Sequence, residues 1–94
     1  MIVGACTIQL YLPGAHSLKD KRSVIRPLMN QLRRRFEVAA AEVDHQDLWQ
    51  SAEIAIVTVA NEAGHVYVTL ERAIHWIEDS YRQVEVVDWT TELR

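Results

Sequence analysis

An α+β fold is predicted by three observations on this 94-residue sequence. Four short segments are rich in apolar and β-branched residues, which is typical of strands. Two longer segments repeat apolar residues at the i, i+3, i+4 and i+7 spacing of a helix with one buried side. The segments follow one another as strand, helix, strand, strand, helix, strand, which is the order of a split β-α-β unit.

The first predicted strand runs from Ile2 to Leu12 and ends at the turn-forming pair Pro13-Gly14. The first predicted helix runs from Ser17 to Phe36, and the hydroxyl of Ser17 can cap its first turn. Its apolar side consists of Leu18, Ile25, Leu28, Met29, Leu32 and Phe36. Pro27 lacks the N–H that would bond to Ser23, at a cost of about 3 kcal/mol. We therefore expect a kink at Pro27, or a regular helix that begins near Ser23.

Two further strands are predicted at Glu37 to Asp44 and Glu53 to Ala60, with residues 45–52 connecting them. Asn61 is a suitable cap for a second helix at Glu62 to Tyr81. The apolar side of that helix consists of Val66, Leu70, Ala73, Ile74, Ile77 and Tyr81. The last strand is predicted at Val84 to Thr90. We expect one ferredoxin-like domain over residues 1–94, in which two helices cover one face of a four-stranded antiparallel sheet.

The uncovered face of this predicted sheet has few polar side chains. In the first strand, the two alternating sets of side chains start at Ile2 and Val3, and neither set is strongly polar. An apolar sheet face on a small protein is usually hidden by a second copy of the chain. We therefore predict a homodimer that packs through this face, in preference to edge pairing; a monomer is the alternative.

The composition excludes several classes of protein. Cys6 is the only cysteine and lies within a predicted strand, which excludes a disulfide framework and indicates a packed thiol in a reducing compartment. No segment is long and apolar enough to span a membrane, and no leader is evident, so we expect a cytoplasmic protein without a membrane partner. The three glycines form no nucleotide-binding pattern, and we expect no cofactor.

Positive charge is concentrated on the first predicted helix. Residues 18–36 hold seven basic side chains against one acidic side chain, a net charge of +6, while the whole chain carries −3. The rest of the chain therefore carries −9. Such segregation favours a localised anionic partner, and it predicts that RNA phosphates are contacted by Lys19, Lys21, Arg22, Arg26, Arg33 and Arg34. The alternative is a solvated helix surface whose arginines pair with acids elsewhere in the fold.

A second candidate site lies at the connection between the middle strands. It consists of Glu42, Asp44, His45 and Asp47, in which a histidine flanked by carboxylates suits a general base or a metal ligand. Metal binding would need His16 or His65 to be brought in by the fold. No metal-binding motif accompanies them, so no metal site is assigned. The simpler interpretation is that Asp44 and Asp47 accept hydrogen bonds from the backbone while Trp49 fills a gap at the sheet edge.

Aromatic residues give little support to base recognition by the sheet. RNA-recognition domains of this fold stack bases on aromatics of the central strands, but the strand at Glu53 to Ala60 has none and the first strand has only Tyr11. If RNA binds, we expect it to contact the basic helix with weak sequence preference. On the second helix, Arg72 is spaced to stack on Trp76.

Several strings of residues resemble a known family. The strings HSLKDKR (residues 16–22) and AEVDHQDLWQ (residues 41–50), with MIVG at residues 1–4 and VEVVD at residues 84–88, resemble the YlxP-like family of small bacterial proteins. The resemblance covers nearly the whole chain. It implies a ferredoxin-like fold and a gene that lies near those for a translation initiation factor and a ribosome-binding factor. It defines no catalytic residue.

Three functional hypotheses follow from the sequence. A non-enzymatic RNA- or ribosome-associated protein is favoured, because the basic helix is the strongest feature of the chain. A small enzyme or metal-binding protein would use His16, Asp44, His45 and Asp47. A protein-interaction module would dock an acidic protein surface on the basic helix. Enzyme activity stays open, and the sequence favours its absence.

Overall fold

The structure, a computed structural model, describes residues 1–94 and has the predicted order of elements. Its strands and helices are β1 (Ile2–Tyr11), α1 (Leu18–Phe36), β2 (Ala39–Asp44), β3 (Ser51–Ala60), α2 (Ala63–Ser80) and β4 (Glu85–Leu93). The predicted ferredoxin-like fold is confirmed.

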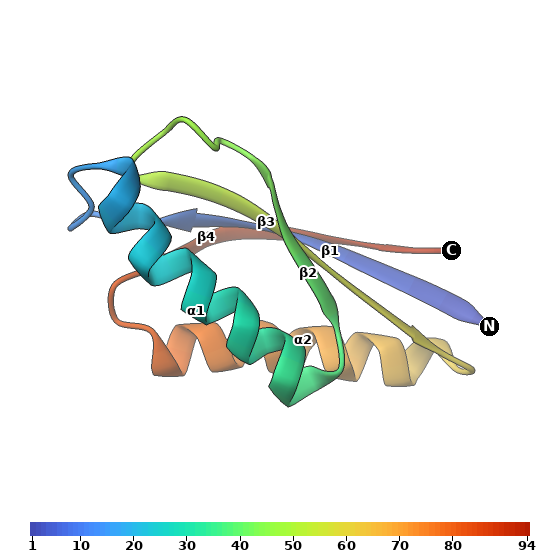
Figure 1. The fold of residues 1–94 in the computed structure, drawn as a ribbon. Coiled ribbons are helices and arrows are strands. Elements are labelled where there is room, and N and C mark those ends of the chain that lie inside the picture. The colour runs from blue at the N-terminus through green and yellow to red at the C-terminus, as the bar shows by residue number, and fades with distance from the viewer.

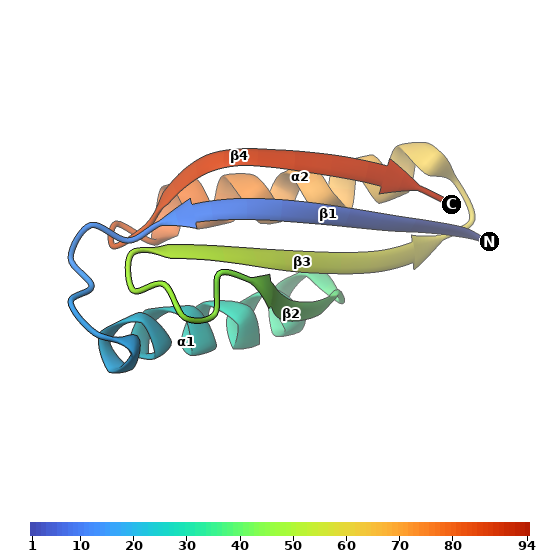
Figure 2. The same cartoon turned by 90° about the horizontal axis from the view of Figure 1, so that it is seen from above.

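The four strands form one antiparallel sheet in the order β2-β3-β1-β4. Strands β1 and β3 occupy the centre, while β2 and β4 form the edges. Both helices lie on the same side of the sheet (Figure 1), and the opposite face is open when seen from above (Figure 2). Neither helix is long and apolar enough to cross a membrane.

The core lies between the sheet and the two helices. Eighteen buried apolar residues form a single cluster. Alternate residues of the central strands enter it, including Cys6 and Ile8 from β1 and Ile54 and Ile56 from β3, because successive side chains of a strand point to opposite faces. Helix packing against these residues excludes water from the predicted apolar sides of α1 and α2.

The ends of the helices show which local predictions were right. Ser17 caps α1 as predicted, since its Oγ accepts a hydrogen bond of 3.0 Å from the N–H of Asp20. The helix runs unbroken across Pro27, so the predicted later start near Ser23 is wrong. Because Pro27 is exposed, its ring points to solvent and disturbs no packing. Asn61 does not cap α2, because the helix begins one residue later and Glu62 occupies the cap position without a side-chain bond.

The open face of the sheet has two parts. One part is apolar and consists of small and β-branched residues: Val3, Ala5, Ala39, Ala41, Ala55, Val57 and Val59, called here the apolar half. The other part lies toward the β2–β3 connection and carries polar and acidic side chains. On β1, β2 and β3 the open face therefore has an apolar half and an acidic part, and Glu92 of the edge strand β4, the register partner of Ala5, borders the apolar half.

Candidate nucleic-acid interface

Five of the predicted phosphate contacts are exposed on α1. They are Lys19, Arg22, Arg26, Arg33 and Arg34, called here the α1 basic surface. The first four share one flank of the helix because their spacing of three, four and seven residues brings them to similar angles at 3.6 residues per turn. Lys19 and Arg33 are about 21 Å apart along the axis at 1.5 Å per residue. Arg34 extends the surface toward the outermost side of the helix.

No carboxylate neutralises the α1 basic surface. The only ion pairs in the protein join Lys21 to Glu42 and Arg94 to Glu92. The alternative in which the arginines of α1 pair with acids elsewhere in the fold is therefore not what the structure shows. Unpaired exposed cations keep their counterions in solution and are available to an anionic partner.

Arg33 is the most firmly held member of this surface. Its guanidinium donates one hydrogen bond to Oδ1 of Asn30 (2.7 Å) and another to the carbonyl of Ala40 on β2 (2.6 Å). A guanidinium has five N–H donors, so three remain for a ligand. Arg33 thus presents an oriented group beside the sheet edge, and it loses little further conformational freedom on binding.

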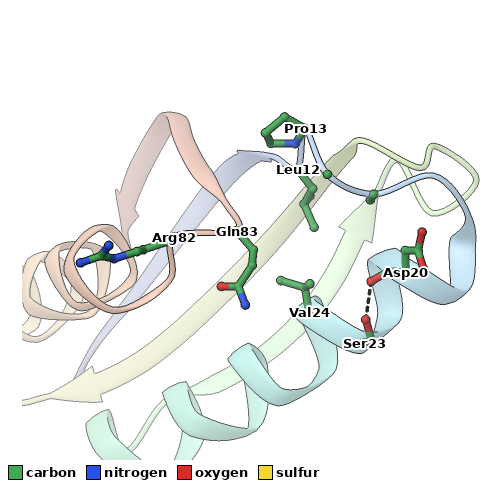
Figure 3. Close-up of a pocket in the computed structure, with 9 residues that line it drawn as sticks. Leu12, Pro13, Asp20, Ser23, Val24, Arg82 and Gln83 are labelled. Carbon is green, nitrogen blue, oxygen red and sulfur yellow. Dashed lines mark hydrogen bonds between the residues drawn. The ribbon is translucent and has the colours of Figure 1, made fainter.

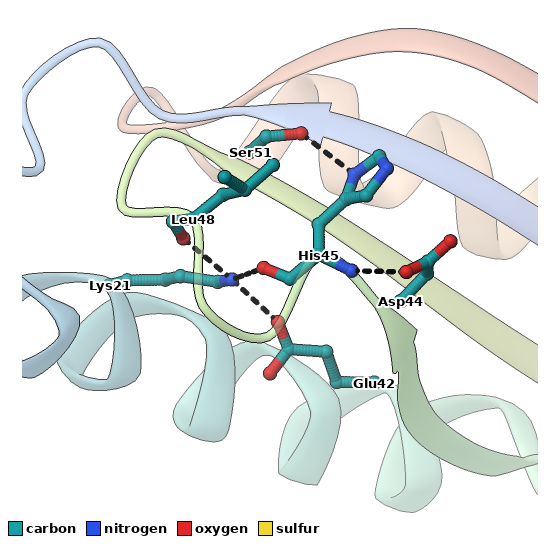
Figure 4. Close-up of polar contacts among 6 residues, drawn as sticks. All are labelled: Lys21, Glu42, Asp44, His45, Leu48 and Ser51. Carbon is teal, nitrogen blue, oxygen red and sulfur yellow. Dashed lines mark hydrogen bonds and ion pairs between the residues drawn. The ribbon is translucent and has the colours of Figure 1, made fainter.

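Lys21 does not belong to the exposed surface, and its prediction as a phosphate contact is corrected. Only 2% of it is exposed. Its ammonium donates hydrogen bonds to the carbonyls of His45 and Leu48 (2.9 Å for Leu48) and forms an ion pair of 2.7 Å with Oε2 of Glu42 (Figure 4). Two hydrogen bonds and an ion pair therefore surround this buried ammonium, which is not accessible to a phosphate.

The spacing of α1 contains the signal for this burial. Lys21 lies four, seven and eleven residues before Ile25, Leu28 and Leu32, which are the buried residues of the helix. It therefore falls at the centre of the buried side. The sequence prediction grouped Lys21 with the neighbouring basic residues by charge and so overlooked its place on the buried side. The acceptors that make burial of its charge tolerable come from a distant part of the chain.

The residues of the second candidate site do not gather around one point. His16 lies in the β1–α1 loop, where its backbone N–H donates to Oδ2 of Asp20 (3.0 Å). In the β2–β3 connection, Oδ1 of Asp44 accepts from the N–H of His45 (2.8 Å), and Nδ1 of His45 is 2.9 Å from Oγ of Ser51. No group of three or more His, Cys, Asp or Glu side chains is placed to hold a metal ion.

Asp44 and His45 instead shape the backbone of the connection. His45 adopts a positive φ of 62°, a conformation that costs free energy for a residue with a Cβ. The carboxylate of Asp44 and the hydroxyl of Ser51 hold it there. The simpler sequence interpretation fits Asp44, but Trp49 fills no gap, since 54% of it is exposed.

A cation–π contact joins the two helices at the far end of α1. Arg35 lies over the ring of Trp76 at 5.2 Å from its centroid, where the sequence had suggested Arg72. Phe36 and Tyr81 pack edge-on against the same indole, at centroid distances of 6.0 and 5.5 Å. Arg35 is therefore a packing residue with an exposed head, next to the α1 basic surface.

A separate cavity of about 430 Å³ lies where the β1–α1 loop, the start of α1 and the α2–β4 loop meet (Figure 3). Asp20 and Arg82 are its charged lining residues. Oδ2 of Asp20 accepts a hydrogen bond from the backbone N–H of His16, and the backbone carbonyl of Asp20 accepts one from Oγ of Ser23 (2.6 Å). These contacts hold the first turn of α1 at the edge of the cavity.

The side chains with shifted pKa values, Cys6 and Tyr81, also lie outside the α1 basic surface. Burial raises the pKa of the Cys6 thiol, and a hydrogen bond with Thr91 offsets part of this rise. Burial likewise raises the pKa of the Tyr81 phenol, which accepts a hydrogen bond from Nε2 of Gln31 (2.8 Å). Both groups pack against the core or seal its edge, so neither is placed as a nucleophile.

Together, the fold and this surface define a small ferredoxin-like α+β protein with one exposed basic helix. The chain belongs to the family described as protein of unknown function (DUF503), whose model matches residues 3–91. It is 28% identical over 91 residues to the uncharacterized protein YlxP of Bacillus subtilis (strain 168), with 97% of this chain and 98% of that protein covered. The predicted membership of the YlxP-like family is confirmed.

Two designed proteins have similar folds. One is a de novo designed protein with a ferredoxin fold, LFR1 1, with a TM-score of 0.60 and 10% identity over 100% of this chain and 84% of that one. The other is the de novo designed protein Foldit4, with a TM-score of 0.54 and 10% identity over 100% of this chain and 97% of that one. At this identity the likeness concerns the fold alone.

Proposed function

We propose that this protein binds RNA, as a ribosome-associated protein without enzymatic activity, through the α1 basic surface. The observation that carries the proposal is that five exposed cationic side chains share one helix and none has a carboxylate partner. Each phosphate contact releases condensed counterions, which favours binding at physiological salt. A ribosome-associated role agrees with the gene neighbourhood that the family resemblance implies.

The contacts on this surface are expected to be to phosphates and to carry little sequence information. Arginine and lysine side chains on a helix flank reach the backbone of a nucleic acid without entering a groove. The exposed aromatics of the protein lie on other elements, so base stacking does not contribute on α1. Binding should therefore depend steeply on salt and weakly on sequence.

The test is fluorescence anisotropy of the purified protein with a labelled ribosomal RNA fragment at several salt concentrations. For five contacts to single-stranded RNA, the slope of log K against log salt should be about −3.5. The variant R22E/R26E/R33E should fold normally and lose binding at least tenfold.

The control variant is R72E/R82E/R94E, which reverses the same number of charges outside α1. It should bind nearly as well as the parent. An equal loss in both triple variants would mean that net charge alone drives the association. Absence of binding at low salt would contradict the proposal directly.

We also propose that the apolar half of the open sheet face is covered by a second copy of the chain. A two-fold axis through this half would set uncharged residues against uncharged residues and leave the acidic parts of both sheets projecting at opposite ends. Edge pairing is less favourable, because β4 carries Glu85, Asp88 and Glu92 and no basic residue.

We also propose a cytoplasmic location for the protein. The free buried thiol of Cys6 supports this location, because the reducing cytoplasm keeps thiols free.

A further inference from the structure

The sheet of this protein contains acidic residues but no lysine or arginine. None of the four strands carries a lysine or an arginine, and neither does the β2–β3 connection at residues 45–50. The acids of the sheet include Asp44, Glu53 and Asp88, and Asp47 lies in the connection. Any cation that neutralises this surface must therefore come from outside the sheet.

Three of these acids lie in one row across the open face. Asp44 of β2 is the register partner of Glu53 of β3, Glu53 is opposite Gln9 of β1, and Gln9 is opposite Asp88 of β4. Directly opposed like charges such as Asp44 and Glu53 destabilise a sheet. This acidic row has no ion pair within the protein, since the only two ion pairs lie elsewhere.

An exposed aromatic hollow adjoins the acidic row. It has a volume of about 640 Å³ and is lined by Tyr11, Asp47, Leu48, Trp49, Gln50 and Ser51. Tyr11 and Ser51 face each other in the register two residues beyond Gln9 and Glu53, so the hollow and the row are continuous. Tyr11, Leu48 and Trp49 are 40%, 50% and 54% exposed, and neither aromatic ring stacks on another ring.

Hydrogen bonds anchor the loop that lines this hollow. The buried ammonium of Lys21 bonds to the carbonyls of His45 and Leu48, as Figure 4 shows, and the N–H of Leu12 donates to the carbonyl of Gln50 (2.9 Å). The side-chain amide of Gln50 also donates to the carbonyl of Pro13 (3.1 Å). Exposed apolar side chains on an anchored loop lose little freedom on binding, which is typical of binding hot spots.

We propose that this surface binds an arginine-bearing segment of a partner protein. A guanidinium stacks on the face of an indole and donates paired hydrogen bonds to carboxylates, so Trp49 supplies the first contact and Asp47, Glu53 and Asp88 supply the second. The carboxylates are spread over separate strands and do not converge to hold a metal ion. They also repel phosphates, so nucleic acid is disfavoured here while the α1 basic surface stays free for it.

The probe is an acetylated and amidated peptide of alternating glycine and arginine, nine residues long. It is titrated into the ¹⁵N-labelled full-length protein and followed by NMR chemical shifts. The expected result is saturable binding with shifts confined to Tyr11, residues 47–53 and Asp88. A matched peptide with citrulline in place of arginine keeps the shape, removes the charge and should bind at least tenfold more weakly.

Two triple variants test whether peptide binding depends on the acids of this surface or on the overall negative charge of the protein. D47N/E53Q/D88N removes three charges from the surface, and it keeps an acceptor on residue 88 for the N–H of Trp89. It should weaken peptide binding at least tenfold, while the control E62Q/E71Q/E78Q, with the same charge change on and beside α2, should leave binding within twofold. W49A should also weaken binding, and W49F should restore most of it.

Several outcomes would overturn the proposal. These are no saturable binding at millimolar peptide, shifts spread evenly over the surface, or equal losses in the two triple variants. A short RNA oligonucleotide that shifts Tyr11 and Trp49 and competes with the peptide would assign the hollow to nucleobases instead. Binding of RNA to α1 is measured separately, so failure of one assignment leaves the other intact.

Discussion

Lys21 shows how one residue fixes a segment far from it in the sequence. Its ammonium lies between α1 and the β2–β3 connection, 24 and 27 residues from the carbonyls that it binds. A buried ammonium is tolerated only when its donors are satisfied, and here two carbonyls and one carboxylate do this. The carboxylate oxygen of Glu42 has no other partner, so each charge depends on the other.

Replacement of Lys21 by methionine should lower the free energy of unfolding by about 3 kcal/mol, because it leaves the Glu42 carboxylate and two carbonyls without their donor. Glu42 is partly exposed, which keeps the loss at the lower end of the range for buried pairs. The measurement is equilibrium unfolding in urea.

The control is Lys19→Met, an exposed position two residues earlier in the same helix, which should change stability by less than about 0.5 kcal/mol. The double variant Lys21→Met/Glu42→Leu should be more stable than Lys21→Met, since it removes the unpaired carboxylate. Equal effects at positions 19 and 21 would mean that the buried contacts contribute nothing.

The thiol of Cys6 makes stability depend on alkaline pH. Burial raises its pKa in the folded protein above the ordinary value of 9.0, so the unfolded chain loses this proton first. The contribution of the protonated thiol to the free energy of unfolding is complete below about pH 9. It is lost as pH rises toward the folded-state pKa, and the free energy of unfolding then falls by up to about 1.4 kcal/mol per pH unit. Urea unfolding between about pH 8 and 10 should show a smaller decline in Cys6→Ala than in the parent. Parallel declines would rule out this role.

At the scale of elements, the contact between β1 and α2 depends on Gly4. A Cβ added at Gly4 would overlap Cγ1 of Val66 and would lie 3.2 Å from Cδ1 of Leu70. The strand and helix therefore approach more closely than any larger residue allows. Glycine is unfavourable within strands in general, and here a packing requirement outweighs that preference.

Gly4→Ala should lower the free energy of unfolding by about 1–3 kcal/mol through overpacking. Gly14→Ala is the matched control, since nothing lies within 4 Å of its added methyl group and its φ is not positive. In a double-mutant cycle, Val66→Ala should relieve part of the Gly4→Ala cost, so the combined loss is smaller than the sum. Strict additivity would show that the two residues do not compete for the same space.

The order of the strands and helices could be predicted because each of them has a recognisable pattern in its own local sequence. The alternation of residues such as Ile8 and Ile54 and the helical spacing of Leu70 and Ile77 follow from burial on one side, and these residues are buried. Helix ends were harder, as Asn61 shows, because a cap depends on where the first turn closes. The role of Lys21 could not be derived from local sequence, since its acceptors come from a hairpin more than 20 residues away.

At the scale of the whole molecule, charge is sorted between the two layers. Helix α1 carries seven of the ten basic residues, and the strands carry none. The α1 basic surface and the acidic row consequently lie in different layers, since one is on a helix and the other is on the open face of the sheet. Such separation lets two partners of opposite charge approach without competing for one surface.

The proposed dimer makes a prediction at the same scale. Val57 lies in the apolar half between its register partners Ala5 and Ala39, so Val57→Asp should convert a dimer into a monomer. Analytical ultracentrifugation at several concentrations measures this change. Val68→Asp, at an exposed valine on α2, should leave the dimer intact. A parent protein that is monomeric at high concentration would refute the proposed interface.

The position of β1 in the sheet also has a consequence for synthesis of the chain. This central strand pairs with β3 and β4 and not with β2, the next strand in the sequence. Its partners are distant in the chain: Tyr11 pairs with Ser51 of β3, and Gly4 pairs with Leu93 of β4. Strand β1 is therefore synthesised before either of its partner strands, and its pairing with β4 forms only after β4 has left the ribosome. A nascent chain that stops before β4 therefore leaves one side of β1 unpaired, and an unpaired strand edge is prone to aggregation.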